Sequence, residues 1–427
     1  MIEILRLASA VISRVLSGRN LDAELRTAWM RHPSLSGHQR ALIQDASYGT
    51  LRYLGCIDAM VDALLDKPLS DPHLRDLLRV AVYQLEYTHL APHAIVDHAV
   101  RCCEALGFGS AKSLTNAVLR NFQRRHAAVE TAALRSDVGR YSHPQWWIDK
   151  LRAQYPAQHE SILEAGNRHP PLALRVNARR ITRDAYLSRL TQAGINARAV
   201  GESAVLLDTP RAVEQIPGFH LGWVSVQDAA AQQAAVWLDA APATRVLDAF
   251  AAPGGKAAHI LERADVDLFT LDCDAGRLER VGENFSRLGL TAHLLHGDAS
   301  KPEAWWDGTA FDCILADVPC SASGVVRRHP DIKWLRRPDD IARFAQQQAL
   351  FLDVLWRLLR RDGKLLYATC SVFQEENSFQ IAHFLGRHPD ARCSTPPGTE
   401  NSTQAPAGQS LPDEDHDGFF YALLQKH

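Results

Sequence analysis

The chain has 427 residues, of which 46% are hydrophobic and 22% charged, and its formal net charge is −2. This composition is typical of a globular protein with enough chain for about three domains. It excludes a basic surface spread over the whole protein, so any binding of nucleic acid has to depend on local clusters of charge.

Residues 1–16 are apolar enough to suggest a signal peptide, but Glu3, Arg6 and Arg14 interrupt the run and no cleavage site follows. We predict an amphipathic core helix there. No apolar run reaches the length of about 18 residues that spans a membrane. The eight cysteines contain no CxxC pair, which indicates free thiols in a reducing compartment and no metal site. We therefore expect a cytoplasmic protein with no membrane contact.

The first third of the chain is predicted to be helical. Apolar residues recur with a period of about 3.6 in residues 4–16, 40–54, 74–87, 95–106 and 111–122. Proline and glycine break the pattern between these segments. Residues 1–135 are therefore predicted to form one compact helical domain.

The middle of the chain contains both helical and strand patterns. Residues 146–155 and 181–193 have helical patterns, whereas residues 172–176 and 204–207 have strand patterns. This mixture predicts a small α+β module in residues 140–235, and residues 228–238 are predicted to form a helix leading into the next domain.

Strands and helices alternate in residues 236–427. The predicted strands are residues 245–247, 268–271, 293–296, 311–316 and 364–368, with helical segments between several of them. This order predicts an α/β domain with a doubly wound parallel sheet. Residues 395–417 are predicted to be an exposed loop, and residues 419–424 a last strand of the sheet.

A loop of small residues follows the first of these strands and precedes a helix. After Asp248, the candidate ligand-binding residues are Phe250, Ala251, Ala252, Pro253, Gly254, Gly255 and Lys256. Small residues let the backbone approach a ligand at the N-terminus of a helix. The GxGxxG and GxxxxGK[ST] patterns are both absent, which disfavours a dinucleotide or a phosphate loop. A tight turn without a ligand is the alternative.

Acids end the next two strands. Asp272 is placed to hold a ribose hydroxyl pair, and Asp298 to contact the exocyclic amine of an adenine. Either acid alone could equally be a helix cap. With Asp248 they stand on three successive strand ends, and this arrangement predicts an adenosyl pocket.

Two cysteine motifs close the fourth and fifth predicted strands. Cys320 follows Asp317-Val318-Pro319, and Cys370 lies in Thr369-Cys370-Ser371. Because the ends of parallel strands line one crevice, both thiols could face one substrate. A thiolate can add to C6 of a pyrimidine, while Asp317 hydrogen-bonds N3 and the second thiol helps to remove the C5 proton. The motifs alone leave open which thiol attacks.

Basic residues follow Cys320 in a segment that also carries Trp334. The candidates for contact with RNA there are Arg327, Arg328, His329, Lys333, Arg336 and Arg337. Arg175 and Arg179 are further candidates in the middle module. A solvated surface without a ligand is the alternative for each group.

Three stretches together resemble a known family: AAPGGK at residues 251–256, DVPCSASGVVRRHPDIKW at 317–334 and ATCSVFQEEN at 368–377. They resemble the NOL1/NOP2/Sun family of RNA cytosine-5 methyltransferases, and within it a bacterial branch that acts on small-subunit rRNA. The resemblance covers the whole chain. It implies an all-α NusB-like RNA-binding domain, a small RRM-like α+β module and a Rossmann-type catalytic domain.

The resemblance also implies roles for the residues. Cys370 would be the nucleophile, Cys320 the cysteine that assists release, and Asp317 the acid at the base. S-adenosylmethionine (SAM) would be held by the loop from Phe250 to Lys256 with Asp272, Asp298 and Asp317. The implied partner is 16S rRNA or a small-subunit assembly intermediate, and we expect a monomer. Phe250 and Val318 depart from the family pattern, which commonly has Cys and Ala there.

Parts of the sequence are also compatible with other functions. The chemistry could act on another RNA such as tRNA, or the chain could be a non-catalytic RNA-binding assembly factor built on the NusB-like domain. The intact Asp317, Cys320 and Cys370 argue against loss of catalysis. An NAD-dependent oxidoreductase would lack its glycine fingerprint and would leave both thiol motifs unexplained.

Overall fold

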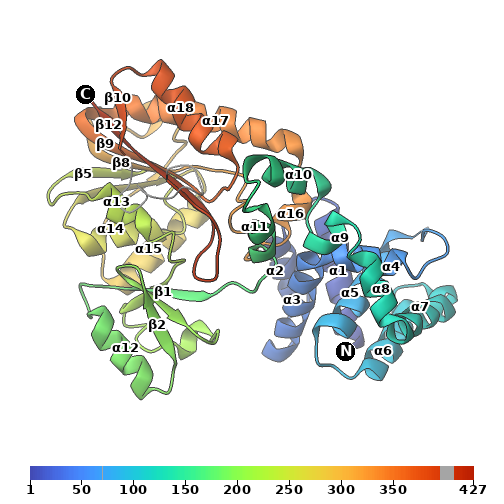
Figure 1. Ribbon diagram of the computed structural model, residues 1–427. Helices are drawn as coiled ribbons and strands as arrows, with labels where there is room; N and C mark the ends of the chain where they lie inside the picture. Colours follow the sequence, from blue (N-terminus) through green and yellow to red (C-terminus); the bar gives the residue numbers. More distant parts are fainter. Residues whose placement is uncertain (70, 395–407) are drawn as a thin grey trace. The chain divides into compact units, whose positions relative to one another are not determined.

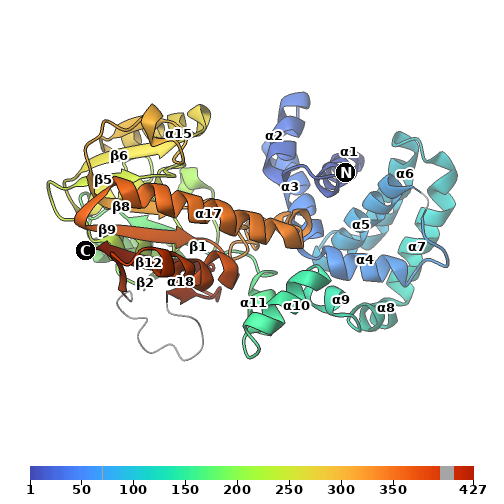
Figure 2. The ribbon, with the colours of Figure 1, turned by 90° about the horizontal axis from the view of Figure 1, so that it is seen from above.

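A computed structural model describes residues 1–69, 71–394 and 408–427 of the chain. Within these residues the chain forms two compact units. Unit 1 contains Met1–Arg168 and Val326–Pro338, and unit 2 contains His169–Val325 and Asp339–His427. The sheets belong to unit 2, while the labelled elements of unit 1 are helices (Figures 1 and 2).

Unit 1 is built from helices that bury one apolar face each. In α1, for example, Leu5, Ala8 and Ile12 are fully buried at helical spacing. Its elements are α1 (Ile2–Leu16), α2 (Leu21–Arg31), α3 (Gly37–Arg52), α4 (Leu54–Asp62), α5 (Pro72–Tyr87), α6 (Pro92–Ala105), η1 (Gly109–Ala111), α7 (Lys112–Arg124), α8 (His126–Ala133), α9 (Asp137–Tyr141), α10 (Gln145–Gln154), α11 (His159–Ala165) and α16 (Ile332–Leu335). The predicted helical domain is confirmed. The structure places α10 and α11 in this unit, whereas the sequence pattern assigned residues 140–168 to the middle module.

A short segment from late in the sequence completes unit 1. Lys333, on α16, is fully buried and donates hydrogen bonds to the carbonyl of Arg52 (2.7 Å) and to Oδ1 of Asn167 (2.8 Å). The indole of Trp334 donates to the carbonyl of Leu51 at 2.7 Å. Residues Val326–Pro338 are therefore an integral part of the helical unit.

The middle module is a four-stranded antiparallel sheet with one helix on it. The strand order is β2-β3-β1-β4. Its elements are β1 (Leu172–Val176), α12 (Arg183–Gln192), β2 (Ala197–Val200), β3 (Ala204–Leu207), η2 (Val213–Gln215) and β4 (Val224–Val226). Leu174 and Val176 on β1 pack with Tyr186 and Leu190 of α12 in one core. Alternate residues of β1, Ala173 and Arg175, therefore face the other side of the sheet.

The rest of unit 2 is a larger mixed sheet with helices on both faces. Among the described residues it has eight strands, in the order β10-β12-β9-β8-β5-β6-β7 with β11 paired to β12. Strands β5 to β9 run parallel, and β12 is antiparallel to β9. The elements are α13 (Gln233–Leu238), β5 (Arg245–Asp248), α14 (Gly255–Arg263), β6 (Asp267–Asp272), α15 (Ala275–Leu288), β7 (His293–His296), η3 (Pro302–Ala304), β8 (Phe311–Asp317), α17 (Pro338–Leu358), β9 (Leu359–Thr369), η4 (Gln374–Glu376), α18 (Ser378–Arg387), β10 (Ala391–Ser394), β11 (Gln409–Ser410) and β12 (Phe419–Lys426). The predicted α/β fold is confirmed, but the sheet is mixed and not all parallel as predicted, because β12 runs antiparallel to both β9 and β10.

Consecutive strand residues point to opposite faces of this sheet. Val246 packs with α13, α14 and α15 in one core, and its neighbour Leu247 packs with α17 and α18 in the other. Figure 1 shows these helices on the two sides of the sheet. The helix predicted at residues 228–238 begins only at Gln233, because Asp228 accepts the backbone N–H of Ala230 and holds a turn.

The last strand was predicted correctly, and it occupies β12. Of the loop predicted at residues 395–417, residues 395–407 lie outside the described part. The remainder is not simply exposed: Gln409 and Asp417 are buried, and β11 pairs with β12.

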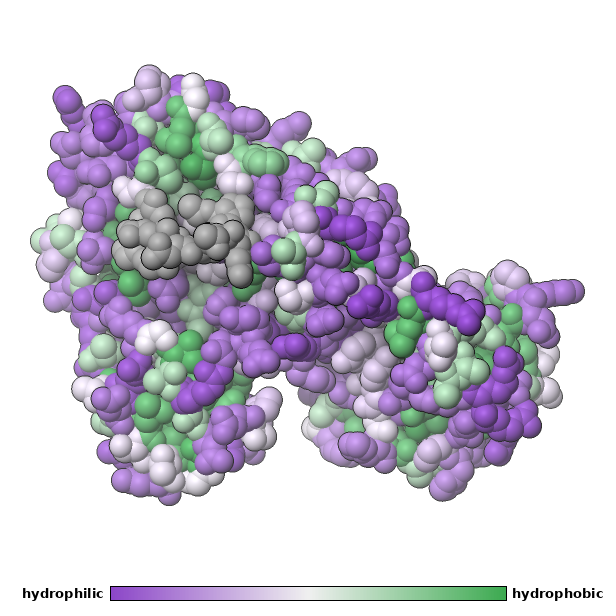
Figure 3. Space-filling view, viewed as in Figure 1, coloured by the Kyte–Doolittle hydropathy of each residue, from purple (hydrophilic) through white to green (hydrophobic). Residues whose placement is uncertain are grey.

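Hydrophilic and hydrophobic residues are interspersed over the face drawn in Figure 3. Among the described residues, no helix combines the length and the apolar character needed to cross a bilayer.

Candidate active site

The parallel strands bring chemically active residues to one edge of the sheet. Asp248 ends β5, Asp272 ends β6 and Asp317 ends β8, while Asp298 and Cys370 follow β7 and β9 closely. Because parallel strands have their carboxyl ends on the same side, these five residues from distant parts of the sequence come together at one edge of the sheet.

A cavity of about 400 Å³ lies at this edge. Residues proposed from sequence that line it are Phe250, Ala252, Asp272, Asp298, Asp317, Cys320 and Cys370. Pro253, Gly254 and Gly255 instead line a cavity of about 210 Å³ against the middle module. The structure therefore gathers both thiols and three of the acids at one cavity, and it places part of the glycine loop on the far side.

Asp272 and Asp298 are held by short-range hydrogen bonds. The carboxylate of Asp272, 5% exposed, accepts the backbone N–H groups of Ala252 (3.2 Å) and Asp274 (3.0 Å). Oδ1 of Asp298 accepts from the backbone and hydroxyl of Ser300, which lowers the pKa of that carboxyl. Carboxylate oxygens have further lone pairs, so both acids can still accept from a ligand in the cavity. This donor set and the half-buried Phe250 fit an adenosyl group.

Lys256 connects the glycine loop to the cavity. Its ammonium group lies 2.5 Å from Oδ2 of Asp317. Burial lowers the pKa of Lys256, but the charges of Asp317 and then Cys370 raise it by more, so the net shift is upward. The ammonium group is therefore charged, and it lies close enough to both Asp317 and Cys370 to interact with them.

Asp248 is the most buried of the four aspartates at this edge, at 1% exposure. Burial and the neighbouring charge of Asp317 raise the pKa of Asp248 to about 7. Its Oδ1 accepts the backbone N–H of Phe250 at 3.4 Å. A carboxyl that titrates near neutrality therefore lies directly behind the loop.

The two cysteines lie side by side. Sγ of Cys320 and Sγ of Cys370 are 3.4 Å apart and share a hydrogen bond. This bond, burial and the nearby charges of Cys370 and Glu376 raise the pKa of Cys320 well above its usual value. Cys320 is therefore a protonated thiol at neutral pH, whereas Cys370 has a cation as its neighbour, a feature that activates nucleophilic cysteines.

A buried acid that the sequence analysis missed joins the two cysteine loops. Glu376 is fully buried and accepts hydrogen bonds from the backbone N–H of Ser321 (2.7 Å) and from the hydroxyls of Ser321 (2.5 Å) and Ser371 (2.6 Å). Gln348 on α17 donates to Glu376 (3.1 Å) and to the carbonyl of Pro319 (3.0 Å). Glu376 was visible in the ATCSVFQEEN stretch, but only the folded chain shows which acid of that stretch is buried.

The basic residues after Cys320 are not all at the surface. Arg327 and Lys333 are 1% and 0% exposed. Arg328, His329 and Arg336 are half-buried and Arg337 is exposed. The buried pair differs from the sequence-based expectation of an RNA-contacting loop, because the helical unit encloses this segment.

The two arginines of the middle module also differ from each other. Arg175 is fully buried and pairs with Glu262, whereas Arg179 is exposed and pairs with Asp265 at 2.6 Å. In this structure the guanidinium of Arg175 is not accessible to an RNA phosphate.

A Rossmann-type sheet with acids at successive strand ends and two adjoining thiols defines a class, the enzymes with a methyltransferase fold. The family model described as 16S rRNA methyltransferase RsmB/F matches residues 235–425. A ferredoxin-like domain of RsmF/B-like methyltransferases matches residues 143–214, and the NusB family matches residues 4–124.

The curated relatives match over the whole chain. Ribosomal RNA small subunit methyltransferase B of Vibrio cholerae is 44% identical over 425 residues, which are 98% of this chain and 96% of the relative. The protein of the same name from Yersinia pestis is 44% identical over 427 residues, 98% of each chain. The chain belongs to this family of ribosomal RNA small subunit methyltransferases.

Solved structures agree with the fold. A crystal structure described as PH0851 is 25% identical with a TM-score of 0.79 and covers 99% of both chains. A methyltransferase homologue from Pyrococcus horikoshii is 28% identical with a TM-score of 0.58, covering 68% of this chain and 97% of its own. NSun6 from the same organism, solved with SFG, is 20% identical with a TM-score of 0.59 and resembles the fold.

Proposed function

We propose that this protein transfers a methyl group from SAM to C5 of a cytosine in 16S rRNA, through a covalent bond between Cys370 and C6 of the base. The observation that carries the proposal is the pair of sulfur atoms 3.4 Å apart in a cavity that also contains Asp272, Asp298 and Asp317. The full-length similarity to small-subunit rRNA methyltransferases supports the substrate.

The first step is attack of the Cys370 thiolate on C6. Negative charge then develops on the base, and Asp317 would hydrogen-bond N3. Lys256 is in contact with Asp317, so the proton on its ammonium group can be shared with the carboxylate as that charge grows. The addition makes C5 electron-rich. SAM, when bound, supplies the electrophilic methyl group.

Release reverses the addition. Water from the solvent accepts the C5 proton, and the electron pair of the C5–H bond re-forms the double bond between C5 and C6. The bond from C6 to the sulfur of Cys370 then breaks, and its electron pair leaves on the sulfur as a thiolate. Cys320 assists this step, because its protonated thiol lies next to the departing sulfur and can hydrogen-bond the thiolate as it forms.

The cofactor and the base would occupy different walls of the cavity. Asp272 and Asp298 would hold the adenosyl part together with Phe250 and Ala252, and the thiols with Asp317 would face the cytosine. A cytosine in folded RNA has to leave its stack to enter, which costs a few kcal/mol and least in a loop. The exposed basic residues, Arg179 and Arg337 among them, are proposed to contact the RNA around it.

The test is transfer of labelled methyl from SAM to unmodified small-subunit rRNA, followed by bisulfite sequencing. We expect one protected cytosine. Label on tRNA instead of rRNA would contradict the substrate but not the chemistry. Binding of SAM without transfer to any RNA would indicate a binding role.

A further inference from the structure

One arginine of the middle module reaches into the larger domain of unit 2. Arg175 lies on β1 between Ala204 of β3 and Ser225 of β4, on the sheet face opposite the module's own core. That face is often open in small antiparallel modules that bind RNA on their sheet. Here Arg175 is 0% exposed, so protein covers this part of the face.

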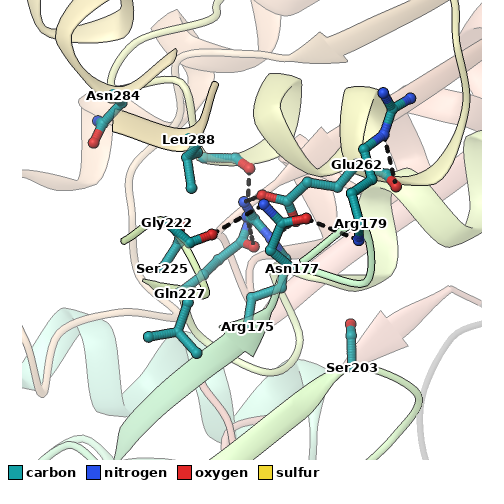
Figure 4. A network of polar contacts seen from close by, with 12 residues as sticks. Arg175, Asn177, Arg179, Ser203, Gly222, Ser225, Gln227, Glu262, Asn284 and Leu288 are labelled. Carbon is teal, nitrogen blue, oxygen red and sulfur yellow. Dashed lines mark hydrogen bonds and ion pairs between the residues drawn. The ribbon is translucent and has the colours of Figure 1, made fainter. Parts of the chain in front are cut away.

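The guanidinium group of Arg175 makes three hydrogen bonds to residues of α14 and a fourth to Gln227. Nε and Nη2 donate to the two carboxylate oxygens of Glu262 at 2.8 and 2.7 Å. Nη1 donates to the carbonyl of Gly255 at 2.6 Å and also to Oε1 of Gln227. Figure 4 shows Arg175, Gln227 and Glu262 together in this network. A bidentate pair of this kind fixes orientation as well as charge.

The carbonyl that Arg175 holds belongs to the glycine loop. Gly255 is the first residue of α14, and the next residue, Lys256, makes the ion pair with Asp317 in the cavity. Glu262 lies on the same helix, two turns further along. Arg175 therefore contacts both the start and the last turn of the helix that carries Lys256.

Other contacts dock the module beside the same loop. Arg287 on α15 donates to the carbonyls of Phe219 (2.8 Å) and Val224 (3.1 Å) in the module. Arg180 donates to the carbonyl of Leu288 at 3.3 Å. The module is thus joined to α14 and α15, the helices that follow β5 and β6 and flank the loop.

Glu262 is the carboxylate that neutralises the buried positive charge of Arg175. Burial and then the positive charge of Arg175 lower the pKa values of both His259, to about 2, and Arg287. His259 is therefore neutral. Because His259 and Arg287 are both bases, neither can supply a negative charge to Arg175 in place of Glu262. Substitution of Glu262 would leave the guanidinium group buried without its ion pair.

We propose that Arg175 is a positioning residue for the cofactor site: by holding the Gly255 carbonyl and Glu262, the middle module fixes the loop from which Lys256 reaches Asp317. This inference rests on the proposed SAM site and assigns the module's buried sheet face to the cofactor rather than to RNA.

The test compares three variants of the full chain. Glu262→Gln keeps the shape of the side chain but removes its charge, and Arg175→Lys keeps the charge but removes the planar fork. Asp265→Asn is the matched control, because Asp265 also pairs with a module arginine but is 88% exposed. SAM affinity is measured by calorimetry and RNA affinity by filter binding, well below the unfolding temperature of each variant.

We expect Glu262→Gln and Arg175→Lys to bind SAM about tenfold more weakly, which corresponds to about 1.4 kcal/mol. RNA affinity should be unchanged, and Asp265→Asn should match the wild type in both assays. The KM for SAM should rise in the same two variants, with the KM for RNA constant. A residue that served only folding would lower the unfolding temperature without this selective effect on SAM.

Unchanged SAM affinity in both variants would overturn the inference, as would a loss confined to RNA affinity. If neither variant folds, Glu262→Asp provides the milder test, because it keeps the negative charge but shortens the side chain that pairs with Arg175; normal SAM affinity there would overturn the inference. Failure of the wild type itself to bind SAM would overturn the proposed function together with this inference.

Discussion

The two thiols of the cavity have different surroundings although they lie 3.4 Å apart. Cys320 is next to the buried Glu376, whose charge helps to raise its pKa, whereas Cys370 interacts with the ammonium group of Lys256. A negative neighbour keeps Cys320 as the protonated thiol, and a neighbouring cation is a feature of nucleophilic cysteines. These surroundings support Cys370 as the proposed nucleophile.

Single substitutions should separate the two roles. Cys370→Ala is expected to abolish methyl transfer and any covalent RNA adduct, because the attacking sulfur is gone. Cys320→Ala should accumulate an adduct that survives denaturing electrophoresis, because release is impaired. Cys393→Ala, at an exposed cysteine, is the control. The reverse pattern would exchange the two assignments.

The raised pKa of Asp248 predicts how the stability of the protein changes with pH. Its pKa is about 7 in the folded protein, against 3.8 for an aspartate in an unfolded, solvated chain, so the folded state binds the proton more tightly. The free energy of unfolding should therefore fall as pH rises from about 4 to about 7, by at most about 4 kcal/mol.

Asp248→Asn can keep the hydrogen bond from Phe250 but does not titrate, so it should flatten this part of the profile. Urea unfolding of the wild type and the variant at several pH values measures the difference. Parallel profiles would show that Asp248 does not carry the effect.

The elements around the cavity owe their geometry to contacts between loops. Glu376 in η4 binds the loop after β8 through Ser321 and the loop after β9 through Ser371. Gln348 adds α17 to the same network. The distance between the sulfur atoms therefore depends on an acid that touches neither of them directly.

We expect Glu376→Gln to fold, since the amide has the same shape and can still accept from Ser321. Methyl transfer should fall by about 10²-fold, the effect expected from a displacement of about 1 Å between reacting groups. The rate of Cys320 alkylation should reach half of its maximum at a lower pH, because one of the charges that raise the Cys320 pKa is lost. Glu303→Gln, at an exposed acid, is the control, and equal activity of both variants would contradict the prediction.

At the scale of the whole molecule, each of the two compact units is built from two separate segments of the sequence. Residues Val326–Pro338 lie between the two cysteine motifs in sequence but belong to the helical unit. There Asp331 accepts the backbone N–H of Leu21 at 3.1 Å, and the indole of Trp334 donates to Leu51. The stretch that looked like an RNA loop is thus mainly a structural part of unit 1.

Trp334→Ala should therefore destabilise unit 1. Trp334 is half-buried against the helical core and also loses its hydrogen bond, so we expect a cost of about 2 to 3 kcal/mol. Met30→Ala, at a side chain that is 74% exposed in the same unit, should change stability by less than about 0.5 kcal/mol. Calorimetric unfolding of both variants measures this, and equal effects would contradict a structural role for the segment.

Local sequence patterns and general rules of topology were enough to predict much of the fold and of the candidate site. The 3.6-residue period of helices such as α1 and α5, the alternation of strands with helices after residue 242 and the acids at the strand ends are all readable from the chain, because they depend on neighbours in sequence. The rule that parallel strands end at one edge then predicted that the acids at the strand ends and the two thiols would face a crevice. Asp272, Asp298, Asp317 and both thiols do line one cavity, whereas Asp248, which was predicted with them, is buried and does not line it.

Tertiary packing decided what sequence neighbours do not encode. Charged side chains are expected at the surface, yet Arg175 is buried with Glu262, 87 residues away, and Lys333 is buried with Arg52, 281 residues away. The raised pKa of Asp248 and the bridging role of Glu376 likewise arise from burial among distant residues. Burial and charge pairing over such separations exist only in the folded chain, which is why composition and motifs could name the chemistry but not the contacts that hold it in place.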